Sequence, residues 1–157
     1  MHLIMRTSYA LLLVLVLPLS SFGDQLNPEE PRDPVVPVEV SGPTVVGFLW
    51  SGTRAQSESD KEMVARLQSA LHDVAKCLGT ENASVRMEFA HVFRLRSGGS
   101  EETVEIPRNY PRSIGAILAR PGAHSEVIYA FRAGSPSQGL LQAASEYFNA
   151  PACHPER

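Results

Sequence analysis

The sequence predicts an α/β domain in which a mixed sheet is flanked by helices, with the element order β-α-β-(α)-β-β-α. Three observations support this fold class. An apolar strand pattern is followed at once by a helix pattern, two later apolar runs flank a Pro-Gly turn, and a second helix pattern follows them. The helix in parentheses stands for residues 97–112, where a strand and a short irregular helix fit equally well.

The first strand is expected over residues 44–50, whose sequence TVVGFLW is β-branched and aromatic, and apolar on both faces. Such a run is typical of a central strand that is buried on both sides. A helix follows, with Ser59 and Glu62 as a capping box and Gly79 at its C-terminal end. Its apolar residues recur at helical spacing and are Met63, Val64, Leu67, Ala70, Leu71, Val74 and Leu78.

The second half of the domain is expected to be mainly strand. One long strand is predicted over residues 85–96, because apolar and polar side chains alternate there with a period of two. Residues 114–119 and 127–131 are apolar runs on either side of a Pro-Gly pair, which predicts an antiparallel hairpin. The closing helix is expected over residues 135–149, with a serine N-cap and a proline at its first position.

The first residues have the features of a secretory signal peptide. Arg6 supplies a basic start, residues 10–19 are apolar, and small residues stand at the positions that a signal peptidase reads. The apolar run is about ten residues long, whereas a bilayer span needs roughly 20, so a membrane anchor is the weaker alternative. We therefore expect a protein of the secretory pathway, either in the endoplasmic reticulum lumen or secreted.

Four segments are expected along the chain. They are a signal peptide at 1–23, a Pro-rich leader at 24–43, the folded domain at 44–150 and a C-terminal tail at 151–157. The dense prolines of the leader favour extended chain over a regular ladder, so we expect it to become ordered only near Ser41. The valines within residues 35–40 nevertheless fit a short edge strand.

The charge pattern excludes some partners. Arg6 is the only charged residue that signal cleavage would remove, which leaves 13 basic and 17 acidic residues. The basic residues are scattered and form no stripe with aromatic residues, which argues against nucleic acid as a partner. No second apolar stretch of bilayer length follows, so no membrane span is expected after cleavage.

Two kinds of modification are candidates in a secreted protein. The chain has two cysteines, Cys77 and Cys153, which form a candidate disulfide in an oxidising compartment. The alternative is two unpaired thiols, and the sequence does not decide between them. Asn82 begins an Asn-Ala-Ser sequence and is a candidate N-glycosylation site.

The order of these elements and several short motifs resemble the thioredoxin fold, and within it the non-catalytic b-type domains of the protein disulfide isomerase family. Residues 44–49 (TVVGFL) resemble the "VVGFF" start of those domains, and residues 115–131 with the last helix resemble their hairpin and final helix. The resemblance covers residues 44–150, although residues 97–112 match poorly. It implies a thioredoxin-like domain that binds unfolded polypeptide or a partner chaperone without a covalent step.

Two departures separate this chain from the catalytic members of that fold. Those members place a Cys-x-x-Cys pair directly after the first strand, where the helix N-terminus favours a thiolate. Here that loop, residues 50–57, contains no cysteine. The catalytic members also have a cis-proline entering the hairpin strand, and the corresponding place here is Ile114-Gly115. We therefore expect a redox-inactive protein that is not an enzyme.

Other chemistry has little support in the sequence. The histidines and cysteines show no metal-ligand spacing, and no phosphate-binding loop or serine-hydrolase elbow occurs, so no cofactor is expected. Trp50 is the only tryptophan and lies at the C-terminal end of the first strand, the end that opens onto ligand sites in α/β sheets. It is a candidate peptide-binding residue, and packing at the rim of the core is the alternative.

The function that we predict from the sequence is that of a redox-inactive, thioredoxin-like protein of the secretory lumen. Its partners are expected to be unfolded polypeptide or another chaperone. The alternative is a secreted extracellular protein that uses the fold as a scaffold for receptor or ligand binding. Retention in the cell or accumulation in the medium would distinguish the two.

Overall fold

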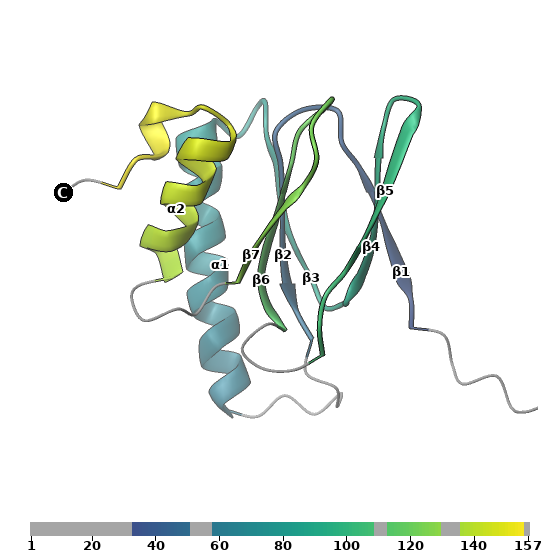
Figure 1. The fold of residues 1–157 in the computed structure, drawn as a ribbon. Coiled ribbons are helices and arrows are strands. Elements are labelled where there is room, and N and C mark those ends of the chain that lie inside the picture. The colour runs from purple at the N-terminus through teal and green to yellow at the C-terminus, as the bar shows by residue number, and fades with distance from the viewer. Residues whose placement is uncertain (1–32, 51–57, 109–112, 130–135, 156–157) are drawn as a thin grey trace, which may run out of the picture. The chain divides into compact units, whose positions relative to one another are not determined.

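The computed structural model describes residues 33–50, 58–108, 113–129 and 136–155 (Figure 1). Residues 33–157 form one compact unit. The predicted signal peptide at 1–23 and the first part of the leader lie outside the described residues, as do the loop at 51–57 and the start of the closing helix at Ser135.

This unit has three layers: two helices, a four-stranded sheet and a three-stranded sheet (Figure 1). The α/β class predicted from the sequence is therefore confirmed. The strands are β1 (Val35–Glu39), β2 (Thr44–Leu49), β3 (Ser84–Glu88), β4 (Val92–Ser97), β5 (Ser100–Glu105), β6 (Ile114–Ala119) and β7 (Glu126–Tyr129). The helices are α1 (Glu58–Leu78), α2 (Pro136–Tyr147) and the short 3-10 helix η1 (Pro151–Cys153). None of the described helices is both long and apolar enough to cross a membrane.

The four-stranded sheet has the order β3-β2-β6-β7. The parallel strands β2 and β3 are joined by α1, and β6 lies antiparallel to both β2 and β7. The predicted hairpin over residues 114–119 and 127–131 is thus confirmed as far as Tyr129, the last residue described there. Every residue of β2 and of β6 is buried, because helices cover one face of this sheet and the second sheet covers the other.

The prediction of one long strand over residues 85–96 is wrong. The chain forms β3, leaves the sheet at residues 89–91 and continues as β4 in the other sheet. No glycine or proline marks this bend, although Phe89 and Ala90 are two successive apolar residues and His91 is a polar residue on the apolar face of the pattern. Phe89, at the bend, is 52% exposed, whereas the pattern would place it in line with the buried side chains of β4.

The three-stranded sheet has the order β1-β4-β5 and contains the stretch that the sequence left open. Residues 97–100 are the turn between β4 and β5, with Gly98 at a positive φ of 57° that glycine adopts without strain. Of the two alternatives for this stretch, the strand is therefore confirmed over residues 100–105.

A second difference from the sequence prediction lies in the leader. Here β1 pairs in parallel with β4, so order begins before Ser41. Pro37 is tolerated because β1 is an edge strand.

Two apolar clusters form the core, one on each face of the four-stranded sheet. Side chains of β2 alternate between them, since successive residues of a strand point to opposite faces. The helix-side cluster contains Val45, Leu49, Leu67, Leu71, Val74, Ile114, Leu118, Leu140 and Ala144. The cluster between the sheets contains Val38, Val46, Phe48, Phe93, Leu95, Val104, Ile106 and Ile117.

The close approach of β6 and β7 depends on Gly115. A side-chain carbon at this position would overlap the carbonyl oxygen of Ile128 and would lie 3.0 Å from Phe48 Cζ. We expect Gly115→Ala to lower the free energy of unfolding by about 1–3 kcal/mol, because a backbone atom must move to admit the methyl group. Urea unfolding followed by circular dichroism measures this change.

Gly99→Ala is the matched control for this prediction. Nothing lies within 4 Å of the added carbon at Gly99, and this glycine has no positive φ. Its substitution is expected to change the free energy of unfolding by less than about 0.5 kcal/mol. Equal stability of the two variants would contradict the tight pairing of β6 with β7.

Candidate functional site

Trp50, the buried His91 and the exposed large apolar side chains lie at one end of the two sheets. The strands β2, β3 and β7 run in the same direction and finish there, whereas β1, β4 and β6 begin there. We call it the carboxyl end of the four-stranded sheet. It is the lower end in Figure 1. In α/β proteins this is the end at which ligands are commonly bound.

Trp50 follows β2 at this end, and three contacts hold it. Its backbone N–H donates to the carbonyl oxygen of Ser113 at 2.9 Å, which extends the β2–β6 pairing by one step. Its ring lies against that of His91, with 4.6 Å between the ring centroids. The guanidinium of Arg108 lies over the tryptophan ring at 6.0 Å from its centroid, within the range of a cation–π contact.

His91 is a buried residue with two charged neighbours. It precedes β4, and its side chain is only 3% exposed. Its Nε2 lies 3.2 Å from Asp33 Oδ2 and 3.2 Å from Arg108 Nη2. Arg108 also donates from Nη2 to the same Asp33 oxygen. Asp33, His91 and Arg108 thus form a three-residue polar cluster that links the start of β1, the start of β4 and the segment after β5.

The polar cluster leaves two buried nitrogens unsatisfied. His91 Nε2 can donate to Asp33 or accept from Arg108, but a single nitrogen cannot do both. His91 Nδ1 and Trp50 Nε1 have no hydrogen-bond partner among the described residues, although both atoms are buried. An unsatisfied buried polar group costs about 1–3 kcal/mol, so native proteins contain few of them.

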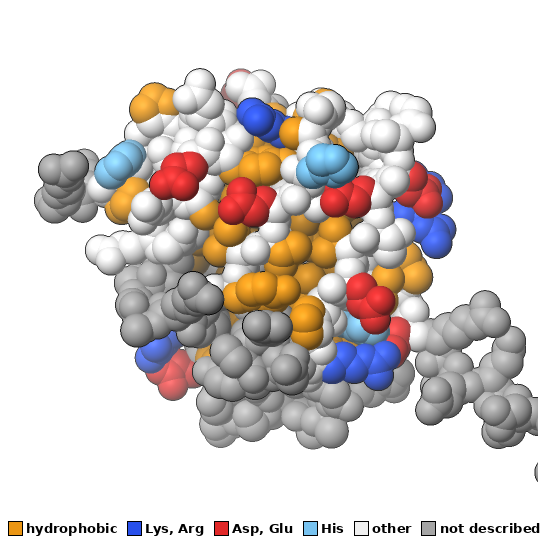
Figure 2. Space-filling view, in the orientation of Figure 1, with side chains coloured by type: hydrophobic (Ala, Val, Ile, Leu, Met, Phe, Trp, Pro, Cys, Tyr) orange, Lys and Arg blue, Asp and Glu red, His pale blue; other side chains and the backbone are white. Residues whose placement is uncertain are grey.

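Exposed apolar side chains gather at the same end. Phe89, Val35 and Tyr129 are 52%, 42% and 37% exposed, and they are the large hydrophobic residues exposed in the described part of the chain. Phe89 follows β3, Val35 begins β1 opposite Val92, and Tyr129 ends β7. Figure 2 shows apolar side chains over the middle of one face, bordered above by acidic side chains.

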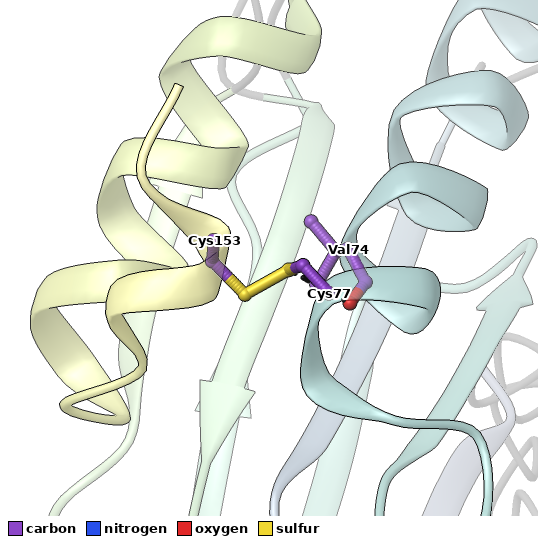
Figure 3. Close-up of a disulfide and its surroundings, with 3 residues drawn as sticks. All are labelled: Val74, Cys77 and Cys153. Atoms are coloured by element: carbon purple, nitrogen blue, oxygen red, sulfur yellow. Dashed lines mark hydrogen bonds between the residues drawn. A yellow bond between two sulfur atoms is a disulfide. The ribbon is translucent and has the colours of Figure 1, made fainter. Parts of the chain in front are cut away.

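The two cysteines lie far from this end. Cys77, in the last turn of α1, is joined by a disulfide to the buried Cys153 of η1, so of the two alternatives the structure has the bridge (Figure 3). Cys77 Sγ lies 3.1 Å from the carbonyl oxygen of Val74. Because α1 leads back to the start of β3, the disulfide lies at the opposite end of the four-stranded sheet from Trp50.

Asn82 lies at the disulfide end as well. It is exposed in the turn between α1 and β3, and its backbone N–H donates to the carbonyl oxygen of Gly79 at 3.2 Å. The side chain of this candidate glycosylation site is therefore accessible. A glycan on Asn82 would stand at the end of the sheet that is remote from Trp50.

A second polar group lies beside α2. The Tyr147 hydroxyl donates to the carbonyl oxygen of His124 at 2.6 Å, and Arg120 lies over the tyrosine ring at 5.2 Å. Burial raises the pKa of Tyr147, and the nearby Arg120 partly opposes this rise. The hydroxyl therefore stays protonated and keeps its hydrogen bond, which indicates a structural role in holding α2 against the β6–β7 turn.

Sequence reasoning singled out Trp50, Cys77, Cys153 and Asn82, and it missed the polar cluster beside Trp50. His91 lies within the strand predicted over residues 85–96 and is almost fully buried. A histidine in line with Phe93 and Leu95 was the available signal, because a polar residue on an apolar face is the informative exception. Among the described residues, no group of three or more histidine, cysteine or acidic side chains is arranged to hold a metal ion.

Comparison of this chain with protein-family models, with curated proteins and with solved structures finds no match.

Proposed function

We propose that this protein is a redox-inactive, thioredoxin-like module that binds unfolded polypeptide at the carboxyl end of its four-stranded sheet. The unit β2-α1-β3, the hairpin β6-β7 and the helix α2 follow one another in the order that the resemblance to protein disulfide isomerase b-type domains implies. The hairpin β4-β5 takes the place of the helix written in parentheses. This order supports the thioredoxin-like assignment.

The observation that carries the proposal is the exposure of three large apolar side chains at one end of the sheets. Val35, Phe89 and Tyr129 come from different strands and from both sheets, yet each lies at the end where Trp50 is found. Large apolar side chains exposed at one end of a fold favour an interaction site there. A polypeptide with exposed apolar side chains would bury them here, and no covalent step is required.

The position of the cysteines supports binding without redox chemistry. Thiol–disulfide exchange needs an accessible thiolate. The chain has only two cysteines, both are in one disulfide, and Cys153 is buried. The bridge also lies at the opposite end from the loop in which catalytic relatives carry their cysteine pair. A disulfide is typical of an oxidising compartment, which supports the secretory lumen or the extracellular space as the location.

Binding of an unfolded polypeptide is expected to change the fluorescence of Trp50, the only tryptophan of the protein. Titration with a tryptophan-free, reduced and alkylated polypeptide measures the affinity. Phe89→Ser is expected to weaken binding about tenfold, since it removes roughly 1.5 kcal/mol of apolar burial in the complex.

Phe89→Leu is the matched control, because leucine keeps an apolar side chain at the same exposed position. It is expected to bind within about twofold of the unmodified protein, a difference of less than about 0.5 kcal/mol. Absence of binding by the unmodified protein would overturn the proposed function, as would reduction of insulin disulfides by the purified protein. Equal binding by the serine and leucine variants would remove Phe89 from the site.

A further inference from the structure

The polar cluster at the carboxyl end is arranged around one carboxylate. Arg108 and His91 belong to different segments, yet Arg108 Nη2 and His91 Nε2 both contact a single oxygen, Asp33 Oδ2. A guanidinium beside one oxygen atom is suited to a carboxylate, because charge-assisted hydrogen bonds are the strong ones, and the imidazole can add a second hydrogen bond in the tautomer that carries its proton on Nε2. The arginine is also positioned by the Trp50 ring beneath it.

Among the described residues, the carboxylate that fills this position lies outside the strand ladder. Asp33 precedes β1, whose first ladder pair is Val35 with Val92, and none of the ladder pairs includes Asp33. Arg108 is 60% exposed, so the ion pair is open to solvent on one side. Asp33 is 25% exposed, so the accessible side of the pair is the Arg108 guanidinium, which an incoming carboxylate can reach from solvent.

Apolar surface adjoins this carboxylate position along the chain. Val35 is two residues from Asp33, and Phe89 is two residues from His91. Both side chains are among the most exposed large apolar groups of the described residues. The same end of the sheet therefore offers a positive group for a carboxylate and apolar side chains for its neighbours.

We propose that Arg108, His91 and Trp50 form a receptor for a carboxylate of the bound polypeptide, and that Asp33 occupies this receptor in the unbound protein. The inference rests on the proposed function and specifies its ligand as an acidic residue, or a chain terminus, next to a large apolar residue. Asp33 acts as an internal competitor. Withdrawal of Asp33 would leave Arg108 free to pair with the incoming carboxylate.

The test compares peptides that differ only in charge. The probes are fluorescein-labelled Gly-Leu-Phe-Asp-Leu-Gly amide, its Asn counterpart, and Gly-Leu-Phe-Asn-Leu-Gly with a free C-terminus, with binding followed by anisotropy. Asp33→Asn is expected to bind the Asp peptide about tenfold more tightly than the unmodified protein does, because a receptor occupied about nine-tenths of the time has its apparent affinity reduced about tenfold. The affinity for the Asn amide is expected to stay unchanged.

Arg108→Gln is the second variant, and it removes the positive charge of the receptor. It is expected to remove the preference for the Asp peptide, both alone and combined with Asp33→Asn. Arg96→Gln is the matched control, because Arg96 is also an exposed arginine paired with an acidic residue, Glu101, but it lies near the far end of β4. The Arg96 variant is expected to keep the preference.

The possible results separate this inference from the proposed function. Equal binding of the Asp peptide and both Asn peptides by the unmodified protein and by Asp33→Asn would overturn the carboxylate receptor and leave polypeptide binding intact. No binding of any peptide or of the unfolded polypeptide by either protein would overturn both. A gain limited to the Asp amide assigns the receptor to acidic side chains, and a gain limited to the free C-terminus assigns it to chain ends. A melting curve for each variant confirms that it is folded at the temperature of measurement.

Discussion

Replacement of both cysteines by alanine is expected to lower the free energy of unfolding by about 4 kcal/mol at 25 °C. The bridge joins positions that are 76 residues apart, so it closes most of the described unit into a single loop in the unfolded chain. Without it the unfolded chain regains the conformational entropy that this loop removes. Domains of this size are stable by about 5–15 kcal/mol, so the loss is a large part of the total. Urea unfolding of the oxidised protein and of the double variant measures it.

The unmodified protein with its disulfide reduced is the matched control, because it keeps both sulfur atoms and lacks only the covalent bond. Its free energy of unfolding is expected to be close to that of the double variant. Because the disulfide and Trp50 lie at opposite ends of the four-stranded sheet, peptide binding is expected to be unchanged wherever the variant remains folded. Equal stability of the oxidised and reduced proteins would show that the bridge constrains the unfolded chain far less than its loop length implies.

The elements that sequence reasoning placed correctly are those with local signals. The strand β2 is a continuous apolar run, α1 has a helical repeat that ends near Gly79, and the hairpin β6-β7 surrounds a Pro-Gly turn. Each signal lies within about 20 residues of sequence and reflects the burial pattern of one element. The α/β class followed from the order of these elements.

The second sheet was missed because its pairings are not local. The valines of residues 35–40 fit a short edge strand, as β1 is, but its partner β4 follows only after β2, α1 and β3. The bend between β3 and β4 contains no glycine or proline, and Phe89, Ala90 and His91 interrupt the alternation only briefly. A periodic pattern shows which face of a strand is apolar, but it does not show that the chain passes from one sheet to another.

The candidate site was only partly predictable for the same reason. Trp50 was found because it directly follows a recognisable buried strand. Asp33, His91 and Arg108 lie in three separate segments, and the contact between them exists only once β1 pairs with β4. Without that pairing, Asp33 is one acidic residue in an acidic leader. The disulfide was identified as a candidate from the count of cysteines, but its formation depends on how α2 and η1 pack against α1.

Phe48→Ala is expected to lower the free energy of unfolding by about 3–5 kcal/mol, the usual cost of truncating a fully buried phenylalanine. Phe48 is completely buried and points from β2 into the cluster between the two sheets. Its ring lies 6.2 Å from that of Phe93 in β4, and 6.4 Å from that of Tyr129 in an edge-on arrangement. Both the apolar burial and these aromatic contacts are lost in the alanine variant. Urea unfolding measures the change.

The control for this prediction is Phe89→Ala, which truncates the same side chain at a position that is 52% exposed. It is expected to cost less than about 0.5 kcal/mol, as surface substitutions usually do. The comparison tests the second sheet directly, because Phe48 belongs to the cluster between the sheets, which includes residues of β1, β4 and β5. A small effect of Phe48→Ala, similar to that of Phe89→Ala, would mean that the three-stranded sheet does not pack on β2. In that case the contacts of Trp50 with His91 and Arg108 would lose their structural basis, because Trp50 follows β2 whereas His91 and Arg108 flank strands of the other sheet.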